Sequence, residues 1–260
     1  MAGLGRAASA AAVIRECRRA LAARGSNVLL EAVGHAGGAD AWRHYPAGDG
    51  YDSVSHAQYF LHRHATPDEP AEAGHFHLFL RAEGMPPGTL PLLLPEAAIA
   101  NLPTPPQAAP LKRGGRDEVS HLVAIALDHD GEPVRLFTTN RWVTGETWYR
   151  ADDVIRMLDR FVLDAAEPAG PVNAWLGAIV RLYQPEIAML LRRRDETVMD
   201  PRRRRRRIDV FEDTRLEVTS SLAIDLDQRL AAADRRVVEH APAAQRPAPR
   251  LPPMAEGWGS

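Results

Sequence analysis

The amino-acid sequence predicts an α+β protein in which an antiparallel sheet, built from hairpins, packs against several helices. Strand-like runs joined by short segments occupy the middle of the chain, whereas helical periodicity dominates its two ends. Of the 260 residues, 45% are hydrophobic and 25% are charged, a composition typical of a folded protein. We therefore expect a single domain over residues 1–240 and a disordered tail, rich in proline and alanine, over residues 241–260.

The first expected element is an amphipathic helix over residues 8–23, where apolar side chains recur at helical spacing before Gly25. Residues 41–52 follow, and their prolines and glycines break regular structure, so we expect an ordered loop. The aromatic runs 57–64 and 74–81 then favour two antiparallel strands, with a short helix over the first run as the alternative. Residues 85–117 hold many prolines and predict a long surface loop.

A second hairpin and three helices complete the expected fold. Residues 121–128 and 133–140 are strand-like runs joined across Asp130-Gly131, a dipeptide suited to a tight turn. Charge and periodicity predict helices over residues 152–164, 172–196 and 225–239, with Pro185 as a kink or break in the second of them. A last strand is expected in residues 209–221.

Composition excludes several classes of function. The formal net charge of −2 argues against an overall electrostatic attraction to nucleic acid or to anionic membranes. The chain has one cysteine, Cys17, which rules out an intrachain disulfide and a thiolate-built metal site. No segment approaches the roughly 20 apolar residues of a membrane helix, so we expect a cytoplasmic protein. The sequence contains no Gly-rich phosphate-binding loop, so it carries no signature of a nucleotide cofactor. The basic run Arg202–Arg207 is interpreted as a solvated charge run.

The histidines are the strongest indication of chemistry, because seven of the ten lie between His35 and His77. In the two-strand interpretation, alternation places His62 and His64 on the same face as His75 and His77. The side chains expected on the opposite, core-forming face are Tyr59, Leu61, Phe76, Leu78 and Leu80. Paired strands would bring the histidines within reach of one ion, and His121, at the start of the next strand, is the outside candidate for the same site.

Such a cluster predicts a divalent transition metal, with iron and zinc as the leading candidates. A carboxylate could complete the site, and the candidates are Asp52, Glu69, Glu72 and Glu83. The alternative is that the histidines are structural and hydrogen-bonded to backbone and carboxylate groups. The pair His75 and His77 loosely resembles the metal motif of cupins, but Glu83 lies further along the chain than that motif allows and no second motif follows.

A second constellation lies in residues 138–149. Its members Asn140, Arg141, Trp142 and Glu146 follow a strand and could bind an anionic or other polar small-molecule ligand. The competing interpretation is structural: a buried ion pair between Arg141 and Glu146 that holds the loop, with the tryptophans as packing.

Several blocks of the chain together resemble a bacterial family known only as a domain of unknown function. The blocks are HYPAGDGYD, HAQYFLH, GHFHLFLR, LFTTNRWVTGETWY and DVFEDTRLEVTSS, and the resemblance runs from about Gly25 to His240. It implies one domain and no assigned activity. From the residues themselves, the leading hypothesis is a histidine-ligated metalloenzyme, of hydrolase or oxygenase type, acting on a small polar substrate. The alternative is a noncatalytic module that binds a ligand or a partner protein through its aromatic and histidine-rich face.

Overall fold

The computed structural model describes residues 2–34, 43–63, 72–92, 118–200 and 209–240. Its centre is a seven-stranded sheet with the strand order β6-β1-β2-β3-β4-β5-β7, in which every neighbouring pair is antiparallel. The strands are β1 (Tyr45–Asp52), β2 (Ala57–His62), β3 (Gly74–Arg81), β4 (Val119–Leu127), β5 (Pro133–Thr139), β6 (Ala166–Glu167) and β7 (Val218–Ala223). The predicted fold class, α+β with a hairpin-built antiparallel sheet, is confirmed.

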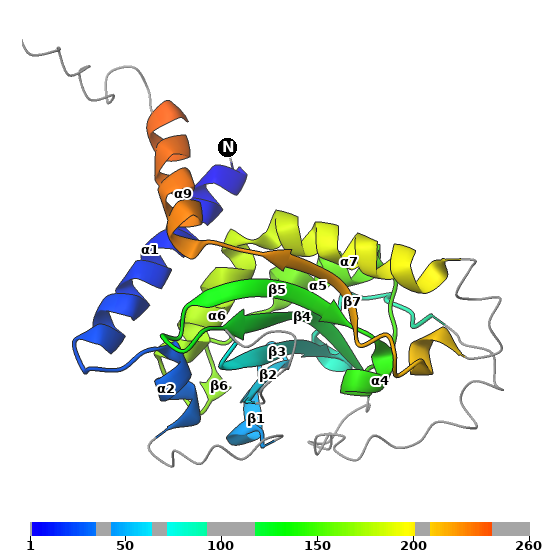
Figure 1. Cartoon of the computed structure of the whole chain (residues 1–260). Coiled ribbons are helices and arrows are strands. Elements are labelled where there is room, and N and C mark those ends of the chain that lie inside the picture. Colours follow the sequence, from blue (N-terminus) through cyan, green and yellow to red (C-terminus); the bar gives the residue numbers. More distant parts are fainter. Residues whose placement is uncertain (1, 35–42, 64–71, 93–117, 201–208, 241–260) are drawn as a thin grey trace, which may run out of the picture.

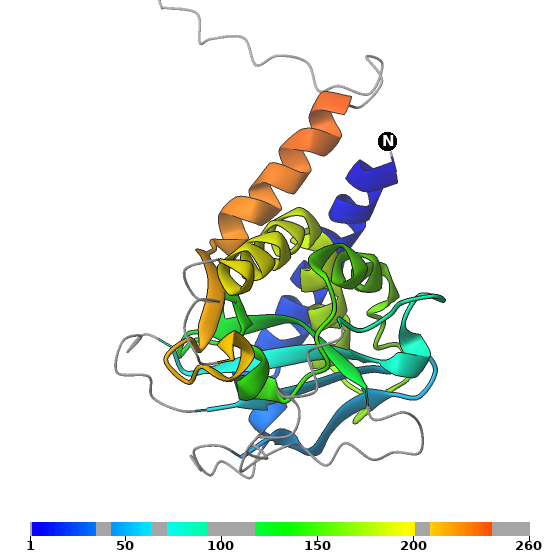
Figure 2. The same cartoon turned by 90° about the vertical axis from the view of Figure 1, so that its right-hand side faces the viewer.

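The longer helices lie along one side of this sheet, as Figures 1 and 2 show. The α-helices are α1 (Ala2–Ala22), α2 (Val28–Val33), α4 (Arg141–Thr144), α5 (Ala151–Met157), α6 (Pro171–Leu182), α7 (Gln184–Met199) and α9 (Leu226–His240). Short 3-10 turns occur at η1 (Ala82–Gly84), η2 (Leu158–Arg160) and η3 (Val210–Glu212). The first and last helices, α1 and α9, lie side by side and extend beyond the sheet in both views. Within the described residues, no helix has the length and apolar character needed to cross a membrane.

The main core lies between the sheet and these helices. Tyr59 and Leu61 of β2 and the inward-facing residues Phe76, Leu78 and Leu80 of β3 are buried in one cluster with α1, α5, α6 and α7. The five side chains predicted for the core face, Tyr59, Leu61, Phe76, Leu78 and Leu80, all belong to it. Trp175 of α6 packs near Phe76, and the hydroxyl group of Tyr59 donates a hydrogen bond to Asn173 Oδ1 at 2.7 Å. Burying each large apolar side chain in such a core stabilises the fold by about 1.5–3 kcal/mol.

The second predicted hairpin is present as β4 and β5. Gly131 adopts a positive φ of 78° in the connecting turn, a conformation that favours glycine. The Asp128 side chain accepts hydrogen bonds from the backbone N–H groups of Asp130 and Glu132, both at 2.9 Å, which holds the turn closed. All nine residues of β4 are buried, in agreement with the apolar character of both of its faces.

The expected ordered loop at residues 41–52 is a wrong prediction, because residues 45–52 form strand β1. Tyr45 pairs with Leu61 and Tyr51 pairs with Gln58, and the register shifts between Tyr45 and Gly50. This irregularity accommodates the proline and the glycines of the segment, which is why the strand signal is weak in the sequence.

Some helix boundaries also differ from the prediction. The helix expected over residues 152–164 ends as an α-helix at Met157 and continues as a 3-10 turn to Arg160. The helix expected over residues 172–196 is divided at Tyr183 into α6 and α7, with Pro185 in the first turn of α7. Most of the predicted loop 85–117, the run Arg202–Arg207 and the tail 241–260 lie outside the described residues.

Candidate metal centre

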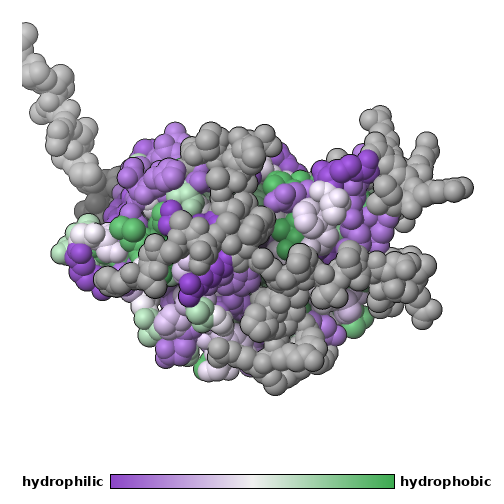
Figure 3. Space-filling model, turned by 60° about the horizontal axis from the view of Figure 1, so that its bottom comes forward, coloured by the Kyte–Doolittle hydropathy of each residue, from purple (hydrophilic) through white to green (hydrophobic). Residues whose placement is uncertain are grey.

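The candidate centre lies on the face of the sheet opposite the helices. Strands β2 and β3 pair so that His62 stands opposite His75 and Phe60 stands opposite His77. Alternation along each strand then places these side chains on the side away from the main core. We call this side the histidine face and define it by His62, His75, His77 and the flanking rings of Phe60, Phe79 and Phe137. Figure 3 turns the underside of Figure 1 forward, where the visible described surface mixes hydrophilic residues with small hydrophobic patches.

Three imidazoles converge at one point of this face. One nitrogen atom from each of His62, His75 and His77 lies within 4.8 Å of the other two. The ring centroids are 4.4 Å apart for His62 and His75, 5.0 Å for His62 and His77, and 4.9 Å for His75 and His77. The exposed fractions of the three residues are 8%, 7% and 1% in sequence order, so the cluster is buried. Such a group has the size and donor type of a transition-metal site.

The surroundings of the cluster are apolar. Phe60 lies 5.2 Å from His77 between ring centroids, and Phe137 lies 5.3 Å from His75. In the register of β3 and β4, His75 is paired with Ala126 and His77 with Ala124. These two alanines pack in one cluster with Phe137 of β5, and their small side chains allow the Phe137 ring to approach His75.

His121 supports the cluster from the neighbouring strand. Its Nε2 lies 3.1 Å from His77 Nδ1, and its Nδ1 lies 3.4 Å from the hydroxyl oxygen of Thr139. If His77 donates its Nδ1–H to His121, then His121 donates its own Nδ1–H to Thr139, and His77 Nε2 keeps a lone pair for a metal. His121 thus lies behind a ligand candidate, and it is not part of the three-histidine group.

Burial favours the neutral form of the His77 and His121 imidazoles. It lowers the pKa of His77 well below 6.5, and the adjacent imidazoles of His75, His62, His121 and His44 add to the effect. Burial, with a smaller contribution from the positive charge of Arg194, lowers the pKa of His121 to about 3. Neutral imidazole is the form of histidine that binds metal, so the environment favours coordination.

The imidazoles of His62 and His75 are in direct contact. Their Nε2 atoms are 2.6 Å apart, close enough for one ring to donate its proton to the other. Two imidazole nitrogens bound to one tetrahedral zinc ion are about 3.3 Å apart. A small separation of the two rings would therefore convert this hydrogen bond into a pair of ligands.

The other residues predicted for the site have different locations. His64 and Glu69 lie outside the described residues. Asp52 accepts hydrogen bonds from the backbone of Val54, Ser55 and Ala165, and Glu83 belongs to η1 at the far end of β3. Glu72 forms a bidentate ion pair with Arg135, at 2.5 and 2.9 Å. Among the described residues, the group with metal-ligand geometry therefore contains histidine alone.

Comparison with known proteins identifies the family of the chain. Residues 8–224 match the model of a family described as Domain of unknown function (DUF6969). The chain belongs to this family. Its match begins and ends earlier than the resemblance in the sequence suggested, and it includes all seven strands and stops before α9. Searches among curated proteins and among solved structures find no match.

Two residues of the family domain that the sequence interpretation did not select lie beside the cluster. His44 stacks on Phe60 with ring centroids 3.7 Å apart and an interplanar angle of 6°. Its Nδ1 lies 3.0 Å from Asp49 Oδ1. Both residues belong to the segment that was expected to be a loop. Pairing with β2 brings them to the histidine face, and a local sequence pattern does not show this.

The residues of the second constellation, Asn140, Arg141, Trp142 and Glu146, do not converge on a common point. Arg141 forms an ion pair with Glu212 of η3, so the predicted pair between Arg141 and Glu146 is wrong. Asn140 accepts a hydrogen bond from the backbone of Arg141 and donates one to Val210 O, and Trp142 donates its indole N–H to Leu216 O. These contacts attach α4 to residues 210–216, which favours the structural interpretation over ligand binding.

Glu146 has a different environment from the one expected. Its Oε2 accepts a hydrogen bond from the backbone N–H of His121 at 2.8 Å, and its Oε1 has no hydrogen-bond partner among the described residues. Burial raises the pKa of Glu146 to about 7, against the opposing charges of Arg194 and Arg141. One of these cations, Arg194, is itself 1% exposed, stacks over Trp148 at 4.1 Å and forms an ion pair with Asp195. Arg194 therefore belongs to the core, although it lies only eight residues before the basic run Arg202–Arg207.

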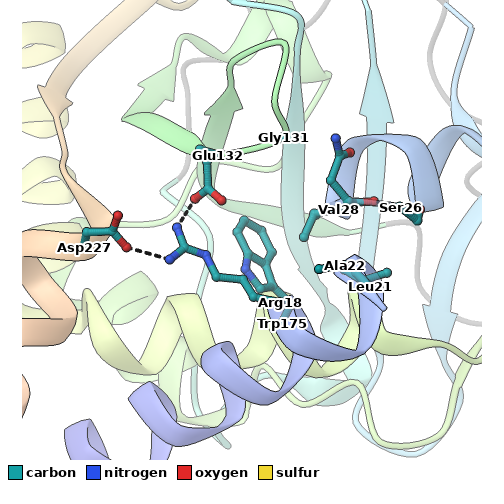
Figure 4. A pocket seen from close by; sticks show the side chains of 10 residues that line it. Arg18, Leu21, Ala22, Ser26, Val28, Gly131, Glu132, Trp175 and Asp227 are labelled. Atoms are coloured by element: carbon teal, nitrogen blue, oxygen red, sulfur yellow. Dashed lines mark hydrogen bonds and ion pairs between the residues drawn. The ribbon is translucent and has the colours of Figure 1, made fainter. Parts of the chain in front are cut away.

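A separate pocket of about 320 Å³ lies on the other side of the sheet, and Figure 4 shows it. It is formed by α1, the turn between β4 and β5, α6 and the start of α9. Its lining residues are Arg18, Leu21, Ala22, Ser26, Asn27, Val28, Gly131, Glu132, Trp175 and Asp227. Arg18 extends into the pocket, where its positive charge is paired with the carboxylates of Glu132 and Asp227. We therefore place the candidate chemistry at the histidine face.

Proposed function

We propose that this protein is a metal-dependent enzyme whose His62, His75 and His77 hold one divalent transition metal. The observation that supports it is the convergence of three buried imidazole nitrogens, within 4.8 Å of one another, on one face of a rigid sheet. Strands position side chains more firmly than loops do, and adjacent strands β2 and β3 supply all three ligands. The hydrogen bond between His77 Nδ1 and His121 Nε2 would orient the ligand and fix its tautomer.

Zinc fits this donor set best. Three neutral imidazoles leave the full charge of a divalent ion in place, and three histidines with one open position are a known catalytic zinc arrangement. Non-haem iron oxygenases typically use two histidines and one carboxylate, and the described group contains no carboxylate. Iron is therefore the second choice.

The three histidines would leave open coordination positions on a bound metal ion for water and substrate. All three histidines rise from the same face of the sheet, so they occupy one side of the ion and its remaining positions point away from the strands. A zinc ion in such a site lowers the pKa of a bound water molecule to about 7 and polarises a carbonyl group. We infer a hydrolytic reaction on a small substrate with a polar, electrophilic group. The phenylalanine rings at the site would contact the apolar part of that substrate.

A noncatalytic binding module is the second candidate. The short distance between His62 Nε2 and His75 Nε2 favours it, because these two rings can satisfy each other without an ion. In this case the histidines and phenylalanines of the face would bind a ligand or a partner chain through hydrogen bonds and stacking.

Metal analysis separates these candidates. The chain, purified without a histidine tag, would be reconstituted in turn with zinc, iron, copper and nickel and measured by mass spectrometry. We expect about one zinc ion per chain in wild type and none in His75→Ala/His77→Ala, which removes two ligands and leaves the core face intact. His129→Ala removes an exposed imidazole in the turn between β4 and β5 and is the matched control, with wild-type zinc content. Wild type that stays metal-free with all four ions would favour the binding module.

A further inference from the structure

A histidine-carboxylate pair lies next to the three-histidine group on the same face. His44 directly precedes β1, and the pairing of Tyr45 with Leu61 places it beside His62. The ring centroids of His44 and His62 are 6.1 Å apart in an edge-on arrangement. His44 is not one of the three residues whose nitrogens converge. It therefore flanks the candidate ion without being a ligand.

A chain of hydrogen bonds fixes this pair in place. Asp49 Oδ1 lies 3.0 Å from His44 Nδ1, and Asp49 Oδ2 accepts a hydrogen bond from Gln58 Nε2 at 2.6 Å. Gln58 Oε1 in turn accepts a hydrogen bond from Arg81 Nε at 2.8 Å. Asp49 has a positive φ of 63° in the irregular part of β1, which directs its carboxylate back toward His44 and Gln58. Its side chain is 4% exposed, so the carboxylate is held by the protein.

This network selects one form of the His44 ring. A carboxylate accepts hydrogen bonds, so Asp49 favours the tautomer with the proton on Nδ1 and leaves a lone pair on Nε2. Stacking on Phe60 fixes the plane of the ring. A neutral histidine oriented by a buried carboxylate is the usual arrangement of a general base.

We propose that His44 accepts the proton of the attacking water at this site and that Asp49 positions it. This proposal rests on the metal-dependent hydrolysis proposed above. In the step, the water oxygen forms a bond to the acyl carbon of the substrate while the carbonyl π pair moves onto the carbonyl oxygen and the water proton passes to His44 Nε2. The carbonyl group then re-forms, the bond from the acyl carbon to the leaving group breaks with its electron pair on the leaving group, and His44 returns the proton to the leaving group or to solvent. The His44 side chain is 17% exposed, which gives the proton a route out of an otherwise buried site.

The first experiment uses zinc-loaded protein and 4-nitrophenyl acetate as the probe. Zinc content is measured for each sample, and then kcat and KM. We expect His44→Gln to keep its zinc and its KM and to lose about 100-fold or more in kcat, the contribution typical of a general base. Added imidazole should restore part of the rate in His44→Gln and none in His75→Ala/His77→Ala. His129→Gln, which removes an exposed ring, serves as the control with a wild-type rate.

The second experiment needs no metal and no turnover. Long-range ¹H–¹⁵N NMR spectra of the metal-free protein report the tautomer of each histidine. We expect His44 to carry its proton on Nδ1 in wild type. Asp49→Asn should weaken this preference, because its amide group can donate a hydrogen bond to Nδ1. In the kinetic assay of the first experiment, Asp49→Asn should lower kcat without changing zinc content.

The outcomes separate this proposal from the metal site itself. Zinc-loaded His44→Gln with a wild-type kcat, or His44 with its proton on Nε2 in wild type, would overturn the general-base role and leave the metal site standing. Zinc-loaded wild type that does not hydrolyse the ester would also overturn it. A wild-type protein that binds no zinc would overturn both proposals together.

Discussion

Alternate residues of β2 and β3 face two different environments, and the contrast shows how one sheet can carry both stability and chemistry. On one side, Tyr59, Leu61 and Phe76 pack into the main core against helices. On the other side, their sequence neighbours His62, His75 and His77 form a buried group of titratable rings. Changes to the first side are therefore expected to alter stability, whereas changes to the second side are expected to alter binding.

The largest effect on stability is expected from Phe76→Ala. Phe76 is 0% exposed and lies between His75 and His77 in sequence, so the variant tests the two sides of the strand against each other. It should lower the free energy of unfolding by about 3–5 kcal/mol, because it leaves a cavity in the core. Urea denaturation measures this loss, and zinc bound per folded molecule should not change. A variant that keeps wild-type stability but loses its zinc would reverse the assignment of the two sides.

The next effect is a pH dependence of stability that arises at Glu146, which binds the backbone of His121. The folded-state pKa of Glu146 is raised from 4.5 to about 7, so the proton on Glu146 stabilises the folded state. This contribution is complete below pH 4.5 and is lost as the pH rises through 7, a change of about 3 kcal/mol. Glu146→Gln cannot ionise and should remove the dependence. The difference between the unfolding free energies of wild type and variant, measured from pH 4 to 8.5, should change by this amount, and a constant difference would contradict the prediction.

A smaller effect is expected at His121, which contacts His77 without being a ligand candidate. His121→Ala removes the ring that orients His77 and should weaken zinc binding about 10- to 100-fold. Competition with a chromophoric chelator measures the affinity. Thr139→Val is the graded control, because it removes only the weaker 3.4 Å contact to His121. Complete loss of zinc in His121→Ala would instead make His121 a ligand.

The smallest effect on zinc binding is expected away from both sides of the sheet, at Arg141. Its ion pair with Glu212 joins largely buried side chains, 13% and 19% exposed, so Arg141→Ala should cost about 1–3 kcal/mol of stability and leave zinc binding unchanged. A double-mutant cycle identifies the partner. Arg141→Ala should show a coupling energy with Glu212→Gln and little coupling with Glu146→Gln. The reverse pattern would restore the pair that the sequence suggested.

The parts of the fold and site that depend on periodicity were predictable. Alternation in β2 and β3 separated the core residues from His62, His75 and His77, and the Asp130-Gly131 dipeptide marked the turn between β4 and β5. Alternation is a local property of an extended backbone, so the sequence shows it directly. Strand β1 was missed because its register shift tolerates proline and glycine, which in isolation indicate a loop.

The sequence by itself determined the class of fold, the core face of the first hairpin and the type of ligand a metal would find. The tertiary structure decided which groups meet. It placed His121 behind His77 and brought His44 and Asp49 beside His62. It also paired Arg141 with Glu212, whereas Glu146 accepts a hydrogen bond from the backbone of His121. Each of these contacts joins segments whose spatial proximity depends on strand order or on an irregular register. The spacing of residues along the chain does not indicate the strand order or the irregular register, because both follow from how the whole sheet and its helices pack together.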